Sequence, residues 1–238
     1  MAVERIVPGG EGWNELIGEH KSRYLFAAQY VRGKRVLDAG CGVGYGTRML
    51  VDAGASEAVG VDISDEALTF ARQHFSHQLI TYTKDDCQTL TRVQPPFDVV
   101  VAFESLEHVA DAAALVRRAS ELLTSSGVFI VSTPNKLLSP QGVNPFHVRE
   151  FTPDEFRDLL SNNFSGIAMM GHRWTAAFTG VYRLWWNPVI RIGRLVQRLL
   201  RQDPSSVLPT EADFVITDSY PATAATLFAV CEGPRVGK

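Results

Sequence analysis

The feature that most constrains this chain is a glycine-rich stretch from Arg35 to Gly46, with the sequence RVLDAGCGVGYG. A short apolar run ends on an acid and is followed by glycines at 40, 42, 44 and 46. This pattern predicts a β-strand, a tight turn and a helix that begins near Tyr45. Glycine lets backbone N–H groups approach a ligand closely, and a helix N-terminus adds partial positive charge. The turn is therefore a predicted cofactor loop, although the pattern also fits a dinucleotide-binding turn or a tight turn without a ligand.

A second apolar run, AVGVDIS at residues 58–64, supports the cofactor interpretation. It follows a predicted helix over residues 47–53 and ends near Asp62, which lies 20 residues beyond Gly42. This spacing places the carboxylate at the end of a neighbouring parallel strand, where it can accept hydrogen bonds from both hydroxyls of a ribose. The two signals together favour a cofactor that carries a ribose.

The segments VLDAGCGVGYG and GVDIS together resemble the class I S-adenosylmethionine-dependent methyltransferases. The first motif of that family carries an acid before the glycines, as Asp38 does here, whereas a dehydrogenase turn usually lacks this acid. The resemblance places Asp38, Gly40 and Gly42 in a loop around the methionine part of the cofactor and assigns the ribose to Asp62. It also implies an α/β fold of Rossmann-like type, with a doubly wound sheet of seven mostly parallel strands whose last strand is antiparallel.

Length and composition agree with a single domain. The chain has 238 residues, of which 45% are hydrophobic and 21% charged, which suits one α/β domain over residues 1–238 with an elaboration. The net charge of −3 gives no overall nucleic-acid-binding character. Residues 1–8 lack an apolar core and no run of about 18 apolar residues occurs, so neither a signal peptide nor a membrane span is predicted. The three widely spaced cysteines favour neither disulfides nor a thiolate metal site, and a cytoplasmic protein is the simplest interpretation.

Residues 1–34 precede the first predicted strand and form a predicted N-terminal helical cap. Apolar residues from Trp13 to Ala28 recur at roughly helical spacing, which predicts one or two amphipathic helices packed on the domain. The segment resembles the leading part of ubiquinone-pathway O-methyltransferases, in which an arginine before the first motif contacts the cofactor. Arg23 matches that arginine, and His20 is either a substrate contact or a surface histidine.

The third predicted strand ends on two acids. Residues 64–75 predict a helix with Ser64 as its N-cap, and LITYTKDDC at 79–87 predicts the strand that follows. In the methyltransferase family an acid at this point accepts a hydrogen bond from the adenine amino group. The distance to the next strand matches Asp86 best, with Asp85 as the alternative.

The segment FDVVVAFESLEHV at 97–109 predicts the edge of the sheet at which chemistry occurs. Its unbroken apolar run is typical of a parallel strand that is buried on both faces. Ligands of open α/β sheets bind beyond the carboxyl ends of the strands, so Phe103 and the residues after it are expected at the cofactor pocket. Residues three and four apart on a helical turn share a face, which is expected to bring together Glu104, Glu107 and His108. The structural alternative is that these residues only mark the start of a helix.

A fourth candidate, His147, lies in NPFHVREFTPDEFRDLL at 144–160. It precedes a predicted helix with Thr152 as N-cap, Pro153 at the first position and Glu155 completing a capping box. A single histidine in a loop usually has no special role, so its interest depends on the motifs that accompany it.

The succession E-x-x-E-H, S-T-P-N and H-x-x-E-F-T-x-x-E-F resembles the metal-dependent branch of the methyltransferase family. That branch includes the small-RNA 3′-terminal 2′-O-methyltransferases and, more loosely, the ubiquinone-pathway enzymes. In the RNA enzymes two glutamates and two histidines hold a magnesium ion against neighbouring hydroxyls. The resemblance maps this set onto Glu104, Glu107, His108 and His147. Such a set suits Mg²⁺ or Mn²⁺ and is also compatible with zinc, whereas the structural alternative is a set of hydrogen bonds at helix ends.

This ligand set has a chemical rationale. An alcohol is a poor nucleophile because it is almost fully protonated at neutral pH, and a divalent cation stabilises the developing alkoxide and orients it for in-line attack. The residues His108 and His147 are also the predicted catalytic proton acceptors, provided that one of them is not fully committed as a ligand. A vicinal diol or a catechol is therefore the predicted acceptor.

The last third of the chain predicts two strands, at 164–171 and 226–232, separated by a basic helical insertion over residues 172–224. From Pro188 onward apolar residues recur at helical spacing, opposite a stripe of arginines at 191, 194, 198 and 201. The interpretations of this basic amphipathic helix are a substrate lid, a homodimer interface, a peripheral contact with an anionic membrane surface, and a surface helix that covers the sheet edge.

The leading block and NPFHVREF also resemble bacterial methyltransferases found with glycan and glycolipid synthesis. We therefore predict an S-adenosylmethionine- and divalent-metal-dependent O-methyltransferase that acts on a vicinal diol of a sugar or glycolipid. The alternatives are a catechol or phenol O-methyltransferase of quinone or secondary-metabolite synthesis, terminal RNA methylation, and a cofactor-binding partner without turnover. Nucleic acid is not the expected partner, because RNA binding would require a basic surface stripe and usually an added domain.

Overall fold

The computed structural model describes residues 13–138, 144–175, 210–218 and 223–235. The strands are β1 Arg35–Ala39, β2 Glu57–Asp62, β3 Ile80–Lys84, β4 Phe97–Phe103, β5 Leu123–Pro134, β6 Phe164–Trp174, β7 Phe214–Thr217 and β8 Thr226–Pro234. The helices are α1 Trp13–Ala27, α2 Tyr45–Asp52, α3 Asp65–His74, α4 Ala112–Leu122 and α5 Pro153–Ser161, with 3₁₀ turns η1 Ala28–Tyr30, η2 Leu106–His108 and η4 Glu211–Asp213.

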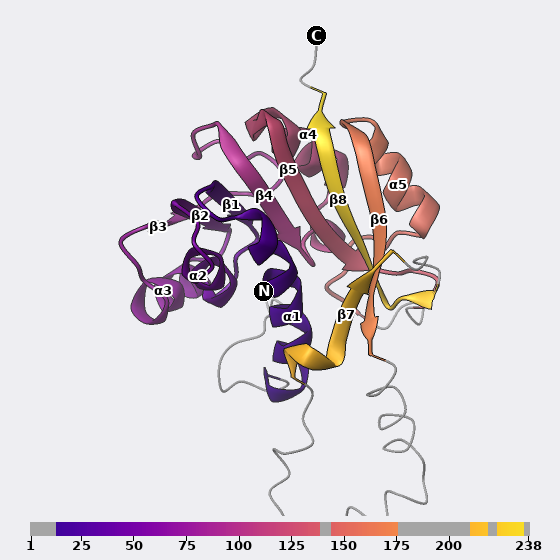
Figure 1. Ribbon diagram of the computed structural model, residues 1–238, viewed down its shortest axis with the longest axis horizontal. Coiled ribbons are helices and arrows are strands. Elements are labelled where there is room, and N and C mark those ends of the chain that lie inside the picture. The colour runs from indigo at the N-terminus through magenta and orange to yellow at the C-terminus, as the bar shows by residue number, and fades with distance from the viewer. Residues whose placement is uncertain (1–12, 139–143, 176–209, 219–222, 236–238) are drawn as a thin grey trace, which may run out of the picture.

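The described strands form one eight-stranded sheet in the order β3-β2-β1-β4-β5-β8-β6-β7 (Figure 1). Strands β3, β2, β1, β4 and β5 pair in parallel, and β8 runs antiparallel to both of its neighbours, β5 and β6. This is the mostly parallel α/β sheet that the sequence predicted, and its last strand is antiparallel as expected. The carboxyl ends of the parallel strands lie at one edge, where the loops after β1, β2, β3, β4 and β5 meet.

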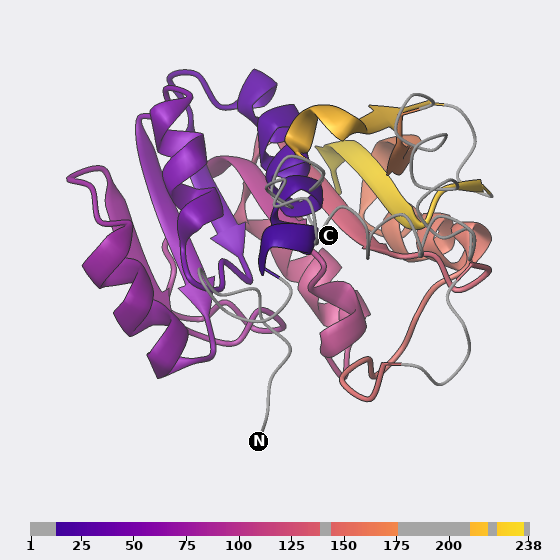
Figure 2. The ribbon, with the colours of Figure 1, turned by 90° about the horizontal axis from the view of Figure 1, so that it is seen from below.

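Helices cover both faces of this sheet, as the view from below shows (Figure 2). In β4, Val99 and Val101 belong to the core formed with α1 and α2, whereas Val100 and Ala102 belong to the core formed with α4 and α5. Successive side chains of a strand point to opposite faces, so a strand covered on both sides has no polar face. This explains why residues 99–103 form an unbroken apolar run in the sequence.

The expected number of seven strands is wrong by one, because the segment 172–224 contains strand structure that was predicted as helix. Strand β6 continues to Trp174, and β7 pairs antiparallel with its end. Strand β7 has only four residues, and among the described strands it pairs only with β6. It is therefore too short to produce a recognisable alternation of apolar and polar residues in the sequence. The predicted basic helix from Pro188 onward lies outside the described residues.

Both predicted helix N-caps are confirmed. The Ser64 hydroxyl accepts a hydrogen bond from the backbone N–H of Ala67 at 3.3 Å. The Thr152 hydroxyl accepts from the N–H of Glu155 at 3.3 Å, and the Glu155 carboxylate accepts in return from the N–H of Thr152 at 2.9 Å. These reciprocal bonds satisfy N–H groups that a helix end cannot pair by itself.

The predicted N-terminal helical cap is present as α1 and η1, and α1 packs across α2 where Gly46 has no side chain. A Cβ atom on Gly46 would lie 1.9 Å from the ring carbon Cζ of Tyr24. The hydroxyl of that same tyrosine reaches Asp38 at the end of β1. The cap is therefore seated directly on the glycine-rich region.

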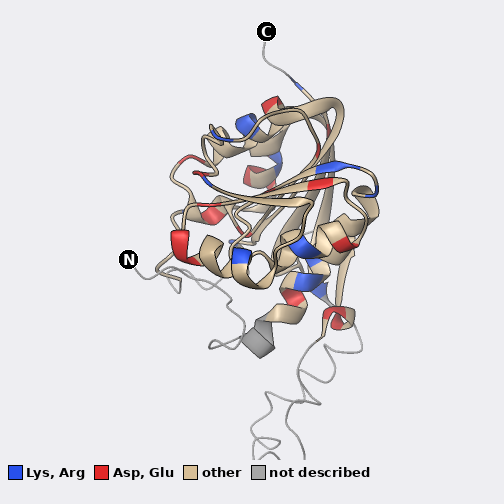
Figure 3. Ribbon diagram, turned by 90° about the vertical axis from the view of Figure 1, so that its left-hand side faces the viewer, with Lys and Arg blue, Asp and Glu red and all other residues tan. Residues whose placement is uncertain are grey.

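Acidic and basic residues are interspersed along the described ribbon in the view of Figure 3. Within the described ranges, no helix combines the length and the apolar character that a bilayer span requires.

Candidate active site

The loop after β1 is shaped by glycines with positive φ angles. The φ angles of Gly40, Gly42 and Gly44 are +89°, +53° and +86°, a region that residues with a Cβ rarely adopt. A Cβ on Gly40 would lie 2.3 Å from the hydroxyl oxygen of Ser105, whereas a Cβ on Gly42 would meet no atom within 4 Å. The loop is thus pressed against the segment after β4 at Gly40 and open at Gly42, which leaves room for a ligand against its backbone.

Asp62, the predicted ribose residue, joins this loop to the end of β2. Its Oδ2 accepts a hydrogen bond from the N–H of Gly42 at 3.0 Å, and its Oδ1 accepts from the N–H of Ser64 at 2.8 Å. The carboxylate therefore lies beside the open side of the glycine loop, at the sheet edge where ligands of open α/β sheets bind.

Asp38 is buried, and its described partners are protein groups. The Thr47 hydroxyl donates to Oδ2 at 2.6 Å and the Tyr24 hydroxyl to Oδ1 at 3.3 Å. Burial raises the pKa of Asp38 to about 7, although the hydrogen bonds from Thr47 and Tyr24 act in the opposite direction. The carboxyl group therefore connects β1 to α1 and α2, and these bonds fix the end of the strand from which the glycine loop starts.

The two acids after β3 have different surroundings. Asp85 is buried and accepts from the backbone N–H of Arg92 at 2.6 Å and of Asp86 at 2.9 Å, so it closes the turn. Asp86 is partly exposed and accepts from the backbone and side-chain amides of Gln88 at 2.8 to 3.2 Å. The assignment of adenine to Asp86 stays a prediction, and the structural role of Asp85 is consistent with it.

Arg23, the predicted cofactor contact on α1, is 1% exposed. Its Nη2 donates to Glu19 Oε1 at 2.7 Å and lies 3.6 Å from Glu104 Oε2, while its Nε and Nη1 find no hydrogen-bond partner among the described residues. Burial would lower the pKa of Arg23, but the carboxylates of Glu104 and Glu19 outweigh it and raise that pKa. Unpaired N–H groups on a buried guanidinium are costly, and they fit a further anionic group such as the carboxylate of S-adenosylmethionine.

Phe103, another predicted cofactor residue, has its side chain in the core. Its ring packs edge-on against Tyr24, with 5.0 Å between centroids, and stacks on Phe228 at 5.7 Å. A direct cofactor contact by this residue stays a prediction.

Glu104 lies at a sharp turn after β4 and does not share a helical face with Glu107 and His108 as expected. Its φ is +48°, and the 3₁₀ turn begins only at Leu106. The Ser132 hydroxyl donates to its Oε1 at 2.7 Å, and its Oε2 lies on the side of Arg23. A positive φ on a residue with a Cβ is strained and is often found at functional sites. Glu104 is not part of the group of possible ligands that Glu107, His108 and His147 form, but its charge is close enough to raise the pKa of Glu107.

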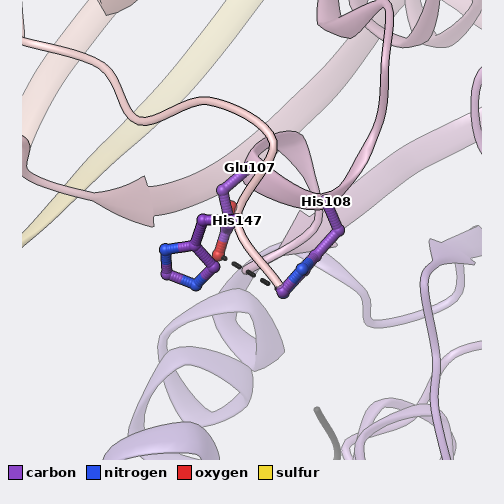
Figure 4. A group of neighbouring side chains, drawn as sticks. All are labelled: Glu107, His108 and His147. Carbon is purple, nitrogen blue, oxygen red and sulfur yellow. Dashed lines mark ion pairs between the residues drawn. The ribbon is translucent and has the colours of Figure 1, made fainter. Parts of the chain in front are cut away.

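The other three predicted ligands come together (Figure 4). One ligand atom from each of Glu107, His108 and His147 lies within 4.8 Å of the others. Glu107 Oε1 is 4.0 Å from His108 Nε2, and the two imidazole centroids are 5.1 Å apart. The structure thus groups one carboxylate with two imidazoles beyond the carboxyl end of β4.

The side chain of Glu107 is 1% exposed, and its two carboxylate oxygens have different surroundings. Oε2 accepts from the Thr133 hydroxyl at 3.0 Å, whereas Oε1 accepts no hydrogen bond from the described residues. Burial, followed by the negative charge of Glu104, raises the pKa of Glu107 well above its ordinary value. A buried, unpaired carboxylate oxygen that faces two imidazoles fits a divalent cation, which would compensate the buried charge.

The segment that carries His147 is docked on Glu107 itself. The backbone carbonyl of Glu107 accepts from the N–H of Val148 at 2.7 Å and of Arg149 at 3.3 Å. These bonds bring a loop from residues 144–150 against the turn η2, although about 40 residues separate the two in the chain.

Several partners of the site residues were not identified from sequence. The hydroxyls of Ser132 and Thr133 hold the two glutamates, and Asn144 and Glu150 bond the ring nitrogens of His147. The S-T-P-N and H-x-x-E motifs contain three of these residues, but sequence spacing does not reveal which side chain each one contacts.

Comparison with known proteins identifies the family. The chain matches the family model described as a methyltransferase domain over residues 14–183. A probable S-adenosylmethionine-dependent methyltransferase of Mycobacterium tuberculosis is 33% identical over 176 residues, which cover 72% of this chain and 63% of that protein. A ubiquinone biosynthesis O-methyltransferase of Neisseria meningitidis serogroup C is 37% identical over 117 residues, which cover 48% of this chain and 49% of that protein. The match therefore spans less than two thirds of the length of these relatives.

Solved structures agree with this result. The magnesium protoporphyrin IX methyltransferase of Synechocystis PCC 6803 with bound SAH is 25% identical, with a TM-score of 0.55 over 68% of this chain and 80% of that one. A possible histamine N-methyltransferase of Thermotoga maritima has a TM-score of 0.61 over 93% and 94% of the two chains at 15% identity, which shows a shared fold. With the Rossmann-like sheet, the glycine loop and the family match in agreement, this chain belongs to the methyltransferase domain family.

Proposed function

We propose that this protein transfers the methyl group of S-adenosylmethionine to one hydroxyl of an acceptor that carries two neighbouring hydroxyls, with a divalent metal ion at the site. The observation that carries the proposal is the buried Oε1 of Glu107, which lies beside two imidazoles and accepts no hydrogen bond within the described part of the chain. In the proposal, the methyl donor is bound by Arg23, the loop at Gly40 and Gly42, Asp62 and Asp86.

Glu107, His108 and His147 would hold the metal ion. When bound, a divalent cation supplies a positive charge that lowers the pKa of an acceptor hydroxyl. One carboxylate oxygen and two imidazole nitrogens favour Mn²⁺ or Zn²⁺ over Mg²⁺, which prefers an all-oxygen shell. The predicted role of His108 or His147 as catalytic proton acceptor would require that one of them is not a ligand.

A contact between the glycine loop and the segment after β4 supports this proposal. Strands β1 and β4 are neighbours, and the Ser105 hydroxyl donates to the carbonyl of Ala39 at 3.2 Å. This contact joins the glycine loop to the segment that leads into Glu107. In the proposal, an acceptor hydroxyl held beside Glu107 would therefore lie near the bound methyl donor, and methyl transfer needs this proximity.

We consider two acceptor classes in this proposal. Sequence motifs favour a sugar or glycolipid diol, and the basic segment from Pro188 would then contact an anionic membrane surface that carries a lipid-linked acceptor. The similarity to a ubiquinone biosynthesis O-methyltransferase favours a catechol. Both acceptors present two adjacent hydroxyls.

The proposal is tested by transfer of radiolabelled methyl groups from S-adenosylmethionine to catechols, sugar diols and glycolipids, with EDTA or with added Mn²⁺, Zn²⁺ or Mg²⁺. We expect EDTA to abolish transfer and Mn²⁺ or Zn²⁺ to restore it. The Glu107→Gln variant should lose transfer but keep its affinity for S-adenosylhomocysteine, because the cofactor loop does not depend on this carboxylate. Glu121→Gln, at an exposed position of α4, is the matched control and should remain active.

Transfer that persists in EDTA, or in Glu107→Gln, would show that the reaction needs no metal at this site. Binding of the cofactor without transfer to any acceptor would instead favour a binding partner without turnover.

A further inference from the structure

We infer that Glu150 and Thr133 are positioning residues that present His147 and Glu107 to the metal ion, an inference that rests on the proposed function. Side chains that ligate a metal usually have their second polar atom held by another protein group, which fixes the tautomer and the direction of the first atom. Each of the three grouped residues meets this condition.

Thr133 holds one oxygen of Glu107. Its hydroxyl is fully buried on β5 and donates to Oε2 at 3.0 Å. Strand β5 pairs in parallel with β4, from which Glu107 follows, and Phe103 is opposite Ser132 in that register. The hydroxyl is therefore fixed by the sheet, and its bond leaves Oε1 as the oxygen directed toward the imidazoles.

Glu150 holds one nitrogen of His147. The distance from Nδ1 to Glu150 Oε1 is 2.7 Å. A carboxylate accepts hydrogen bonds, so this contact places the ring proton on Nδ1 and a lone pair on Nε2, which is the tautomer that a metal ligand needs.

A contact with Asn144 indicates that Nε2 of His147 carries the lone pair. The side-chain Nδ2 of Asn144 lies 2.8 Å from His147 Nε2, while its Oδ1 accepts from the N–H of Phe146 at 3.0 Å. The second bond fixes which end of the amide faces the ring, so Nε2 is the acceptor of an N–H donor. A cation would take the position of this amide N–H.

His108 follows the same pattern through the backbone. Its Nδ1 lies 3.1 Å from the carbonyl oxygen of Phe146, which can only accept, so Nδ1 carries the proton. Its Nε2 is then the unprotonated nitrogen, 4.0 Å from Glu107 Oε1. Residues 144–150 thus supply groups that orient both histidines, and the backbone of Glu107 holds this segment in place.

The inference is tested by titration of the purified protein with Co²⁺, followed through the visible absorption of the bound ion. Glu150→Ala should weaken Co²⁺ binding about 10- to 100-fold, as is typical when an outer partner of a metal ligand is removed. Glu150→Gln should recover part of the affinity, because its amide oxygen can still accept from Nδ1. Thr133→Val should weaken binding in the same way, and Thr133→Ser should restore it.

Asp154→Asn is the matched control for charge. It removes one negative charge from an exposed position four residues from Glu150 and should leave Co²⁺ affinity unchanged. Affinity for S-adenosylhomocysteine reports the fold of each variant and should stay at the wild-type level.

The possible outcomes separate this inference from the proposed function. If Glu150→Ala and Thr133→Val bind Co²⁺ as the wild type does while Glu107→Gln does not, the inference is overturned and the metal site stands. If the wild type binds no Co²⁺, or if Glu107→Gln binds it equally well, both the metal site and the positioning roles are wrong.

Discussion

At the scale of single residues, the buried carboxyl of Asp38 ties the glycine loop to the helices that pack over it. Burial raises its pKa from 3.8 to about 7, so the folded chain keeps this proton at pH values where the unfolded chain has lost it. Stability from this group is therefore complete below about pH 4 and is lost as the pH rises toward 7. The asparagine of the Asp38→Asn variant does not titrate. As the pH rises through this range, the free energy of unfolding of the wild type should therefore fall relative to that of the variant.

Urea unfolding of both proteins across this pH range measures the difference. Parallel curves for the wild type and Asp38→Asn would mean that Asp38 is ionised in the folded state throughout, contrary to the raised pKa.

The backbone conformation of Glu104 is a feature of a single residue that the sequence does not reveal. The spacing of Glu104, Glu107 and His108 predicts one helical face only if all three residues are helical. The backbone at Glu104 has a φ of +48°, and glutamate carries no sequence signal for that conformation. By contrast, the caps at Ser64 and Thr152 depend on local side-chain chemistry and could be predicted.

At the scale of elements, the contact between α1 and α2 is limited by the absence of a side chain at Gly46. An added Cβ would lie 1.9 Å from the Tyr24 ring, which cannot retreat without losing its hydrogen bond to Asp38. Gly46→Ala should therefore lower the free energy of unfolding by about 1–3 kcal/mol, as is usual when a packed core receives an extra methyl group. It should also weaken S-adenosylhomocysteine binding, because Arg23 lies on the displaced helix.

Gly166→Ala on β6 is the control, since its Cβ would lie 3.6 Å from that of Glu232, an ordinary contact. Chemical denaturation and calorimetric titration measure the two effects. Equal stability of the two variants would contradict the close packing of α1 on α2.

Most elements could be predicted because each has a local cause. The apolar run at 99–103 lies within β4, since both faces of that strand are covered. The meeting of His147 with Glu107 was implied by resemblance alone, because it depends on backbone bonds between segments about 40 residues apart. No periodicity in either segment encodes that contact.

At the scale of the whole molecule, α1 connects the far edge of the sheet to the cofactor loop. It packs against η4 and β7 at one side and against α2 at the other. Phe214, at the start of β7, is 8% exposed, and its ring centroid lies 5.4 Å from that of the buried His172. Phe214→Ala should cost about 3 kcal/mol of unfolding free energy and should speed amide hydrogen exchange in α1.

Val215→Ala is the matched control, because the next residue along β7 is 37% exposed and should change stability by less than about 0.5 kcal/mol. Unchanged exchange in α1 of the Phe214→Ala protein would show that β7 and α1 are energetically independent.

The place of β8 between β5 and β6 also determines when the described sheet can be completed during synthesis. Strand β8 can pair only after the ribosome has extended the chain to Pro234. Until then, the edges of β5 and β6 that β8 later covers have no partner strand. Exposed strand edges of this kind invite pairing with other chains. The nascent protein should therefore be most prone to aggregation just before β8 emerges, and a chaperone that shields sheet edges would act at that moment.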